Sequence, residues 1–156
     1  MKSPLIRLFI SALLVSSIST NCFARNETAQ QALNCAAVFS VLSKGYAHDG
    51  TLASKFTKVA DLFTHIYMQE QVANTPADEQ ASIQLRNAAT LELRHALPAR
   101  AAYFREDTVI CGAWAEGFMS QGEHMQFMLV YPKVVPMQVR ATYQTYADQV
   151  IQRLAR

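Results

Sequence analysis

Two short stretches, each containing a cysteine, organise this chain: residues 33–39, LNCAAVF, and residues 109–118, VICGAWAEGF. A disulfide between Cys35 and Cys111 would close a loop of about 76 residues. Such a bond would join the first helix of the folded chain to one of its last helices. It would therefore constrain how every segment between the two cysteines is arranged.

The N-terminal residues have the pattern of a secretory signal peptide. Lys2 and Arg7 give a positive start, residues 8–18 are apolar apart from small serines, and Ala24 ends a cleavage site. The apolar run is shorter than the roughly 20 residues that a membrane-spanning helix needs. We predict a signal peptide over residues 1–24, cleavage near Ala24, and a periplasmic or secreted mature chain without a stable membrane anchor.

Cleavage at this site would leave exactly two cysteines. Cys22 is lost with the signal peptide, so Cys35 and Cys111 remain in the mature chain. An exported protein matures in an oxidising compartment, where two cysteines form one disulfide. The absence of a Cys-x-x-Cys motif argues against a redox-active pair. We therefore predict a structural disulfide between Cys35 and Cys111.

Length and charge limit the classes of partner. Residues 25–156 are 132 of the 156 residues, a length that suits a single helical domain. Removing Lys2 and Arg7 leaves 12 basic against 12 acidic residues. A net charge near zero argues against nucleic acid, which is held largely by clustered positive charge.

Apolar periodicity and capping signals predict helices through most of the mature chain. The expected helices cover 26–45, 51–72 and 75–97, a further segment that contains Cys111, and 136–154. We predict an all-α fold, an irregular bundle of about five helices with one long-range disulfide.

The third expected helix and residues Met125–Tyr131 carry further structural signals. The third helix has the strongest start signal, a Thr75 cap followed by Pro76 and Asp78. Its expected packing face is rich in alanine and reads Ala81, Leu85, Ala88, Ala89, Glu92, Leu93 and Ala96. Residues Met125–Tyr131 fit either a short strand or a helical turn, and we favour the helix because no partner strand is evident.

Four side chains suggest a metal site in a helix bundle. Glu92 and His95 have the Glu-x-x-His spacing of di-iron bundles, and Asp61 and His65 would lie on one face of the second helix. The second copy of the motif is missing, so ordinary surface side chains are the simpler interpretation. We predict no cofactor.

A basic and aromatic segment is the best candidate for binding. Arg94, Arg100, Tyr103 and Arg105 combine the residue types that are common at protein interfaces. The alternative is a solvated face with local ion pairs. Trp114 belongs either to this binding surface or to the core. The apolar stretch Met125–Val135 is a candidate homodimer contact.

No sequence motif of a hydrolase or a covalently attached haem is present. We therefore expect a non-enzymatic, exported protein that acts by binding another protein. At the level of architecture the layout is similar to that of periplasmic immunity and inhibitor proteins, which implies a toxin or envelope hydrolase as the partner. The alternatives are a bundle that binds a metal or small ligand, and an envelope-stress or chaperone-like protein.

Overall fold

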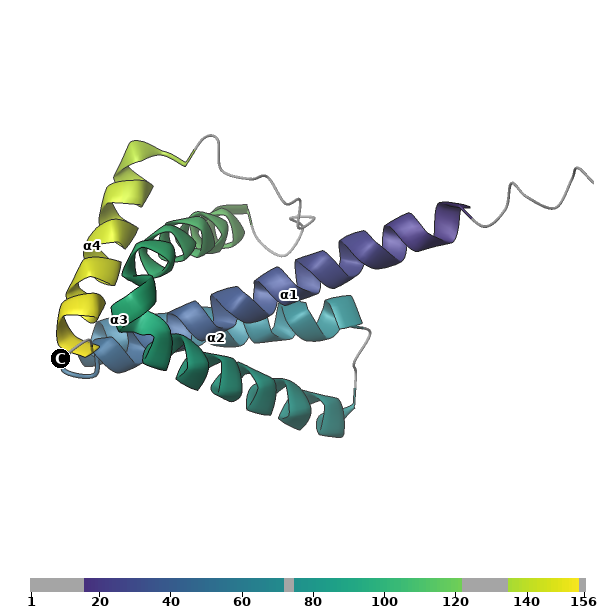
Figure 1. The fold of residues 1–156 in the computed structure, drawn as a ribbon, viewed down its shortest axis with the longest axis horizontal. Coiled ribbons are helices and arrows are strands. Elements are labelled where there is room, and N and C mark those ends of the chain that lie inside the picture. The colour runs from purple at the N-terminus through teal and green to yellow at the C-terminus, as the bar shows by residue number, and fades with distance from the viewer. Residues whose placement is uncertain (1–15, 72–74, 122–134, 155–156) are drawn as a thin grey trace, which may run out of the picture.

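The computed structural model describes residues 16–71, 75–121 and 135–154 (Figure 1). They form four helices: α1 (Ser16–Gly45), α2 (Gly50–Gln71), α3 (Pro76–Gln121) and α4 (Met137–Leu154). The all-α prediction is confirmed for this part of the chain. The expected count of about five helices is slightly too high, because the third expected helix continues into the one that contains Cys111.

The continuation through α3 is not straight. Arg100 has non-helical backbone angles, φ −121° and ψ 23°, two residues after Pro98. Proline inside a helix lacks the amide hydrogen for the helical bond and crowds the preceding turn, so a kink is expected here. The kink divides α3 into a first half, residues 76–99, and a second half, residues 101–121, which run in different directions in Figure 1.

Helix α1 lies at the centre of the fold and contacts the other three helices. From Cys35 to Leu42 every residue except Ser40 is buried. A helix that is apolar on all sides is normally surrounded by other elements, as this one is. The predicted start at Asn26 is wrong, since α1 begins at Ser16. No glycine or proline interrupts residues 16–25, and the predicted cleavage site lies within the helix.

Helix α2 follows α1 after a short turn and runs back along it (Figure 1). The Asp49 carboxylate caps its start, accepting hydrogen bonds from the backbone N–H groups of Thr51 and Leu52 at 3.1 and 3.0 Å. The buried side chains of α2 include Phe56, Val59, Phe63 and Ile66, which recur three or four positions apart and therefore lie on one face of the helix. The α1–α2 pair therefore forms the base on which α3 and α4 pack.

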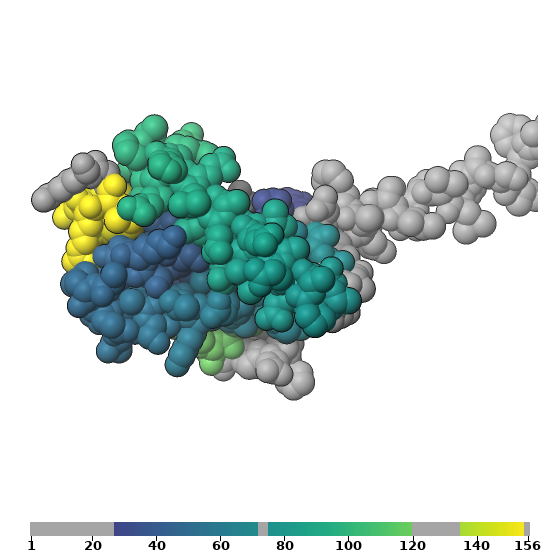
Figure 2. All heavy atoms as spheres, turned by 90° about the horizontal axis from the view of Figure 1, so that it is seen from below, coloured from purple at the N-terminus to yellow at the C-terminus, as the bar shows by residue number. Residues whose placement is uncertain are grey.

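The first half of α3 begins as predicted but presents a different face to the core. Thr75 and Asp78 form the expected reciprocal cap. The predicted packing stripe is wrong in part, because Leu85 is 46% exposed whereas Ser82 and Thr90 are 3% and 1% exposed. The helix is thus rotated by about one residue relative to the expectation, and it forms part of the molecular surface in Figure 2.

Hydroxyl groups make this rotation possible. Ser82 and Thr90 donate their hydroxyl hydrogens to backbone carbonyls four residues earlier, at 2.8 and 2.7 Å. A buried hydroxyl that bonds to its own helix has no unsatisfied polar group. Arg86 on the same face reaches α2, where it binds Asp61 at 2.6 Å and Thr64 at 3.3 Å.

Helix α4 closes the core against the second half of α3. Tyr143 is 2% exposed and its ring packs on Gly112, where no side chain intervenes. The same ring meets Phe39 edge to face, with centroids 6.1 Å apart. Further aromatic contacts connect the rings of Tyr46, Phe56, Phe63, Phe118 and Tyr146.

Residues Met125–Tyr131, expected as helix or strand, lie outside the described residues, as does nearly all of the candidate dimer contact Met125–Val135. Within the described helices, none combines the length and the apolar character that crossing a membrane would require.

Candidate functional site

The predicted disulfide is present and joins α1 to the second half of α3. The sulfur atoms of Cys35 and Cys111 are 2.06 Å apart and their Cα atoms are 5.3 Å apart. Each cysteine is 1% exposed. The bond thus lies at the interface of the central helix and α3, beneath the surface.

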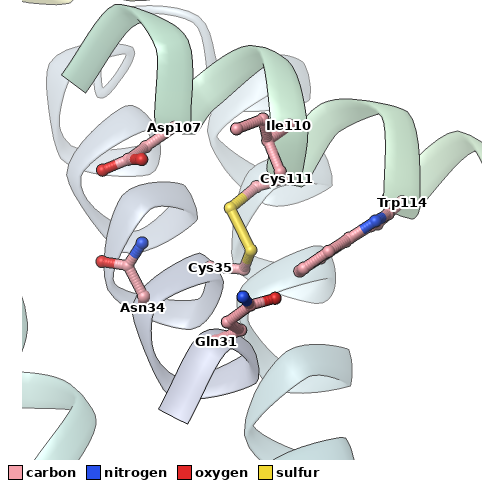
Figure 3. A pocket seen from close by; sticks show the side chains of 7 residues that line it. All are labelled: Gln31, Asn34, Cys35, Asp107, Ile110, Cys111 and Trp114. Carbon is pink, nitrogen blue, oxygen red and sulfur yellow. A yellow bond between two sulfur atoms is a disulfide. The ribbon is translucent and has the colours of Figure 1, made fainter. Parts of the chain in front are cut away.

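A cavity of about 110 Å³ lies beside the disulfide. Its lining comes from both helices and is shown in Figure 3: Gln31, Asn34 and Cys35 on α1, and Asp107, Ile110, Cys111 and Trp114 on α3. In this view Asp107 lies toward Asn34, Trp114 toward Gln31, and the disulfide between them. The cavity therefore has a polar end with a carboxylate, an aromatic wall and a base formed by sulfur.

The carboxylate at the polar end has a perturbed acidity. Partial burial raises the pKa of Asp107, because removing water disfavours the charged form. A hydrogen bond from the Asn34 side chain and the nearby charge of Arg100 lower this pKa, whereas the negative charge of Glu106 raises it further. Burial has the larger effect, so the surroundings of Asp107 stabilise the negative charge of its carboxylate only in part.

At the other end, Gln31 contributes an acceptor that is not used. Its Oε1 atom is buried and has no hydrogen-bond partner among the described residues. Buried polar atoms are nearly always paired, so an exception needs an explanation, such as a bound group that completes the bond.

On the second half of α3, three of the cavity residues belong to a row of side chains that continues to the protein surface. Tyr103, Asp107, Ile110 and Trp114 are spaced by four, three and four residues, so they lie along one side of the helix. We call these four residues the α3 stripe. Tyr103 is 67% exposed, whereas the other three are partly buried. The stripe thus carries one aromatic side chain at each end and the cavity between them.

The structure separates the five residues predicted to bind a partner. Tyr103 and Trp114 belong to the α3 stripe, and the Arg100 guanidinium lies over the Tyr103 ring, 5.4 Å from its centroid. Arg105 points to α4 instead, where its Nε and Nη2 atoms bind Asp148 at 2.8 and 2.6 Å. Arg94 is exposed on the first half of α3, on the other side of the kink.

The four residues of the hypothetical metal site are also kept apart. In residues 16–71, 75–121 and 135–154, no three His, Cys, Asp or Glu side chains are grouped as metal ligands. Asp61 forms its ion pair with Arg86, and the ring of His65 bonds to Gln69 at 3.1 Å. Glu92 and His95 are both exposed on the first half of α3.

The residues predicted from the sequence did not include Gln31, Asn34, Asp107 and Ile110, although the cysteine pairing contained a signal for two of them. Gln31 and Asp107 each precede a paired cysteine by four residues, and Asn34 and Ile110 each precede one by a single residue. Residues four positions apart lie on the same face of a helix, so Gln31 and Asp107 are expected beside the paired cysteines. A spacing of one residue gives no such signal, so Asn34 and Ile110 could not be found in this way.

Fold and site together define a disulfide-bonded, all-α protein with a small cavity between its central helix and α3. Comparisons of the chain with protein family models, with curated proteins and with solved structures found no match.

Proposed function

We propose that this chain is an exported, non-enzymatic protein that binds another protein through the α3 stripe and the adjoining Arg100. The observation that carries the proposal is the exposed Tyr103, with Arg100 stacked on its ring, at the end of a stripe that continues to Trp114. The few residues that dominate the binding energy of protein interfaces are enriched in tyrosine, tryptophan and arginine.

The attachment of the α3 stripe to the core favours its use as a protein interface. The disulfide ties the second half of α3 to the central helix, and Thr108, Val109 and Ala115 on the same half are fully buried. A surface that is rigid before binding loses less conformational entropy when a partner docks. The α3 stripe is therefore better suited to an interface than the first half of α3, where the polar contacts to α2 are those of the single side chain Arg86 with Asp61 and Thr64.

Export is the second element of the proposal. It rests on the N-terminal pattern of Lys2, Arg7, the apolar residues 8–18 and Ala24, and agrees with a disulfide that requires an oxidising compartment. The partner class that we propose is an envelope-targeting toxin or hydrolase, which the protein would inhibit.

A photo-crosslinking experiment tests the proposed interface. The full chain is expressed in cells that export it, with p-benzoylphenylalanine at position 103 in one variant and at position 91 in the control. Tyr103 and Leu91 are 67% and 50% exposed, so neither substitution should disturb the core. We expect one discrete crosslinked protein from position 103 and none from position 91.

The other outcomes separate the alternatives. Equal products from both positions, or none from either, would contradict an interface on the α3 stripe. A ladder of many products from position 103 would favour the chaperone-like function. Because Arg105 holds α4 through Asp148, the charge-reversal test is Arg100→Glu, with Arg94→Glu as the control; only the first should weaken capture.

A further inference from the structure

The cavity beside the disulfide combines a carboxylate with a buried acceptor. Its one formal charge is Asp107, which accepts a hydrogen bond from Asn34, and Gln31 Oε1 has no hydrogen-bond partner among the described residues. The rest of the wall is apolar and consists of Ile110, the disulfide and the indole of Trp114. A complementary ligand would carry positive charge, donate hydrogen bonds and have an apolar body.

We propose that this cavity binds an alkylammonium group, with the charged head at Asp107 and Asn34, and the aliphatic stem over the disulfide against Ile110 and Trp114. The site shares Asp107, Ile110 and Trp114 with the α3 stripe, but it is inferred from the cavity lining and not from the exposed Tyr103. Lysine-type ammonium groups have three donors and no acceptor, so they match a carboxylate and an amide oxygen. The face of a tryptophan also attracts cations and packs against methylene groups.

The acidity of Asp107 supports this ligand class. Burial raises the pKa of its carboxyl, and the ionised form would be stabilised by a cation placed next to it. The guanidinium of Arg100 lies over the Tyr103 ring instead. An ammonium head would complete the compensation that the neighbouring groups provide only in part.

The volume limits the size of the ligand. Sites for drug-sized molecules measure about 300–1,000 Å³, whereas this cavity measures about 110 Å³. A single ammonium group on a short alkyl chain fits such a space. The distal end of the chain would lie near Gln31, so a ligand with a second donor there should bind more tightly.

Trp114 makes the site directly observable, because it is the only tryptophan in the chain. The oxidised protein is titrated with n-pentylammonium chloride at constant ionic strength, and the indole N–H resonance of Trp114 is followed by NMR. We expect a saturable shift. 1-Pentanol has the same alkyl chain without the charge, so it should give no saturable shift at the same concentrations.

Two variants on α3 test the carboxylate. Asp107→Asn removes the charge inside the cavity and should raise the Kd for n-pentylammonium at least about tenfold, the factor that corresponds to one lost charged contact. Glu92→Gln removes the same charge at an exposed position on the first half of α3, outside the cavity lining, and should change the Kd by less than about twofold. Equal effects of the two variants would overturn the assignment of Asp107.

The comparison of ligands keeps the proposal falsifiable even if Asp107→Asn does not fold. A shift that is not saturable, or one that 1-pentanol reproduces, would overturn the proposal with the unmodified protein alone. At the Gln31 end, 5-amino-1-pentanol should bind more tightly than n-pentylammonium, and Gln31→Met should remove that difference.

A final measurement identifies the source of the ammonium group. A Gly-Lys-Gly peptide with blocked ends presents the same group on a polypeptide. If the peptide also shifts the Trp114 resonance, the cavity accepts a lysine side chain of a protein. If only the free amine does so, the cavity is specific for a small molecule. Both results support an ammonium site, whereas binding of neither overturns it.

Discussion

The ring of Tyr143 lies directly on the backbone of Gly112, so that a Cβ atom at position 112 would come within 2.5 Å of both Cδ atoms of the ring. A separation below 3.0 Å is essentially never seen for a real Cβ, and Tyr143 is fixed in the core at 2% exposure. Gly112 is therefore required by the close approach of α3 and α4.

The first prediction is that Gly112→Ala destabilises the protein. Alanine has the better helix propensity by about 1 kcal/mol, but overpacking a core typically costs about 1 to 3 kcal/mol. We expect a lower midpoint in urea denaturation. Gly50→Ala is the matched control, since nothing lies within 4 Å of a Cβ there. If Gly112→Ala is as stable as that control, the Tyr143 ring does not pack closely on residue 112.

The second prediction concerns alkaline pH. Burial, followed by the hydrogen bond that Tyr143 donates to Glu116 at 2.9 Å, raises the pKa of Tyr143 above its ordinary value of 10.0. Above pH 10 the unfolded chain loses this proton and the folded chain keeps it. The stabilisation is thus fully present below pH 10 and is lost as pH rises, by about 1.4 kcal/mol per pH unit for one proton.

Urea denaturation between pH 8 and 11 measures this dependence. Tyr143→Phe should make the decline in the free energy of unfolding less steep, while costing about 1 kcal/mol at neutral pH for the lost hydrogen bond. Tyr103→Phe, at an exposed tyrosine, should not alter the decline. An unchanged slope in Tyr143→Phe would show that the Tyr143 hydroxyl is not buried in the folded protein.

The third prediction is that the Cys35–Cys111 bond provides a large share of stability. It closes a loop of 76 residues, for which the loop-entropy model gives roughly 4 to 5 kcal/mol. Reducing agent should lower the melting temperature of the unmodified protein. Cys35→Ala and Cys111→Ala should have similar effects, and reducing agent should have no further effect on either variant. Melting that does not respond to reducing agent would refute this role.

A comparison of α1 with the first half of α3 shows how far the sequence predicts the fold. In α1 the run from Cys35 to Leu42 is apolar on all sides and the helix is central, so composition alone indicates its place. In α3, apolar periodicity selected Leu85, whereas Ser82 and Thr90 are buried. Periodicity treats hydroxyl residues as polar and cannot register that they bond to their own helix.

Prediction of the candidate site from the sequence is limited in the same way. The pairing of Cys35 with Cys111 could be predicted from export and cysteine count, because no other partner remained. The cavity could not, since Gln31 and Asp107 are ordinary polar residues until the disulfide brings their helices together. The sequence shows that Arg105 is charged but not that it forms an ion pair, because its partner Asp148 lies 43 positions away.

The fourth prediction follows from the unequal attachment of the two halves of α3. The second half is held by the disulfide and the aromatic core. The first half is held by the bonds of Arg86 to α2 and by Leu93 and Leu97, while its buried residues Ser82 and Thr90 bond only to their own helix. Segments with little buried apolar surface open at lower free energy. Hydrogen exchange measured by mass spectrometry should therefore be faster over residues 76–96 than over 104–118.

Arg86 provides the sharper form of this test. Its side chain is 16% exposed and joins the first half of α3 to Asp61 and Thr64 of α2. Arg86→Met keeps the aliphatic stem but removes these bonds, so exchange should accelerate over residues 76–96 and stay unchanged over 104–118. Arg94→Met, at an exposed position, should change neither region. Equal protection of both halves, or acceleration of both by Arg86→Met, would mean that α3 opens as a single unit despite its kink.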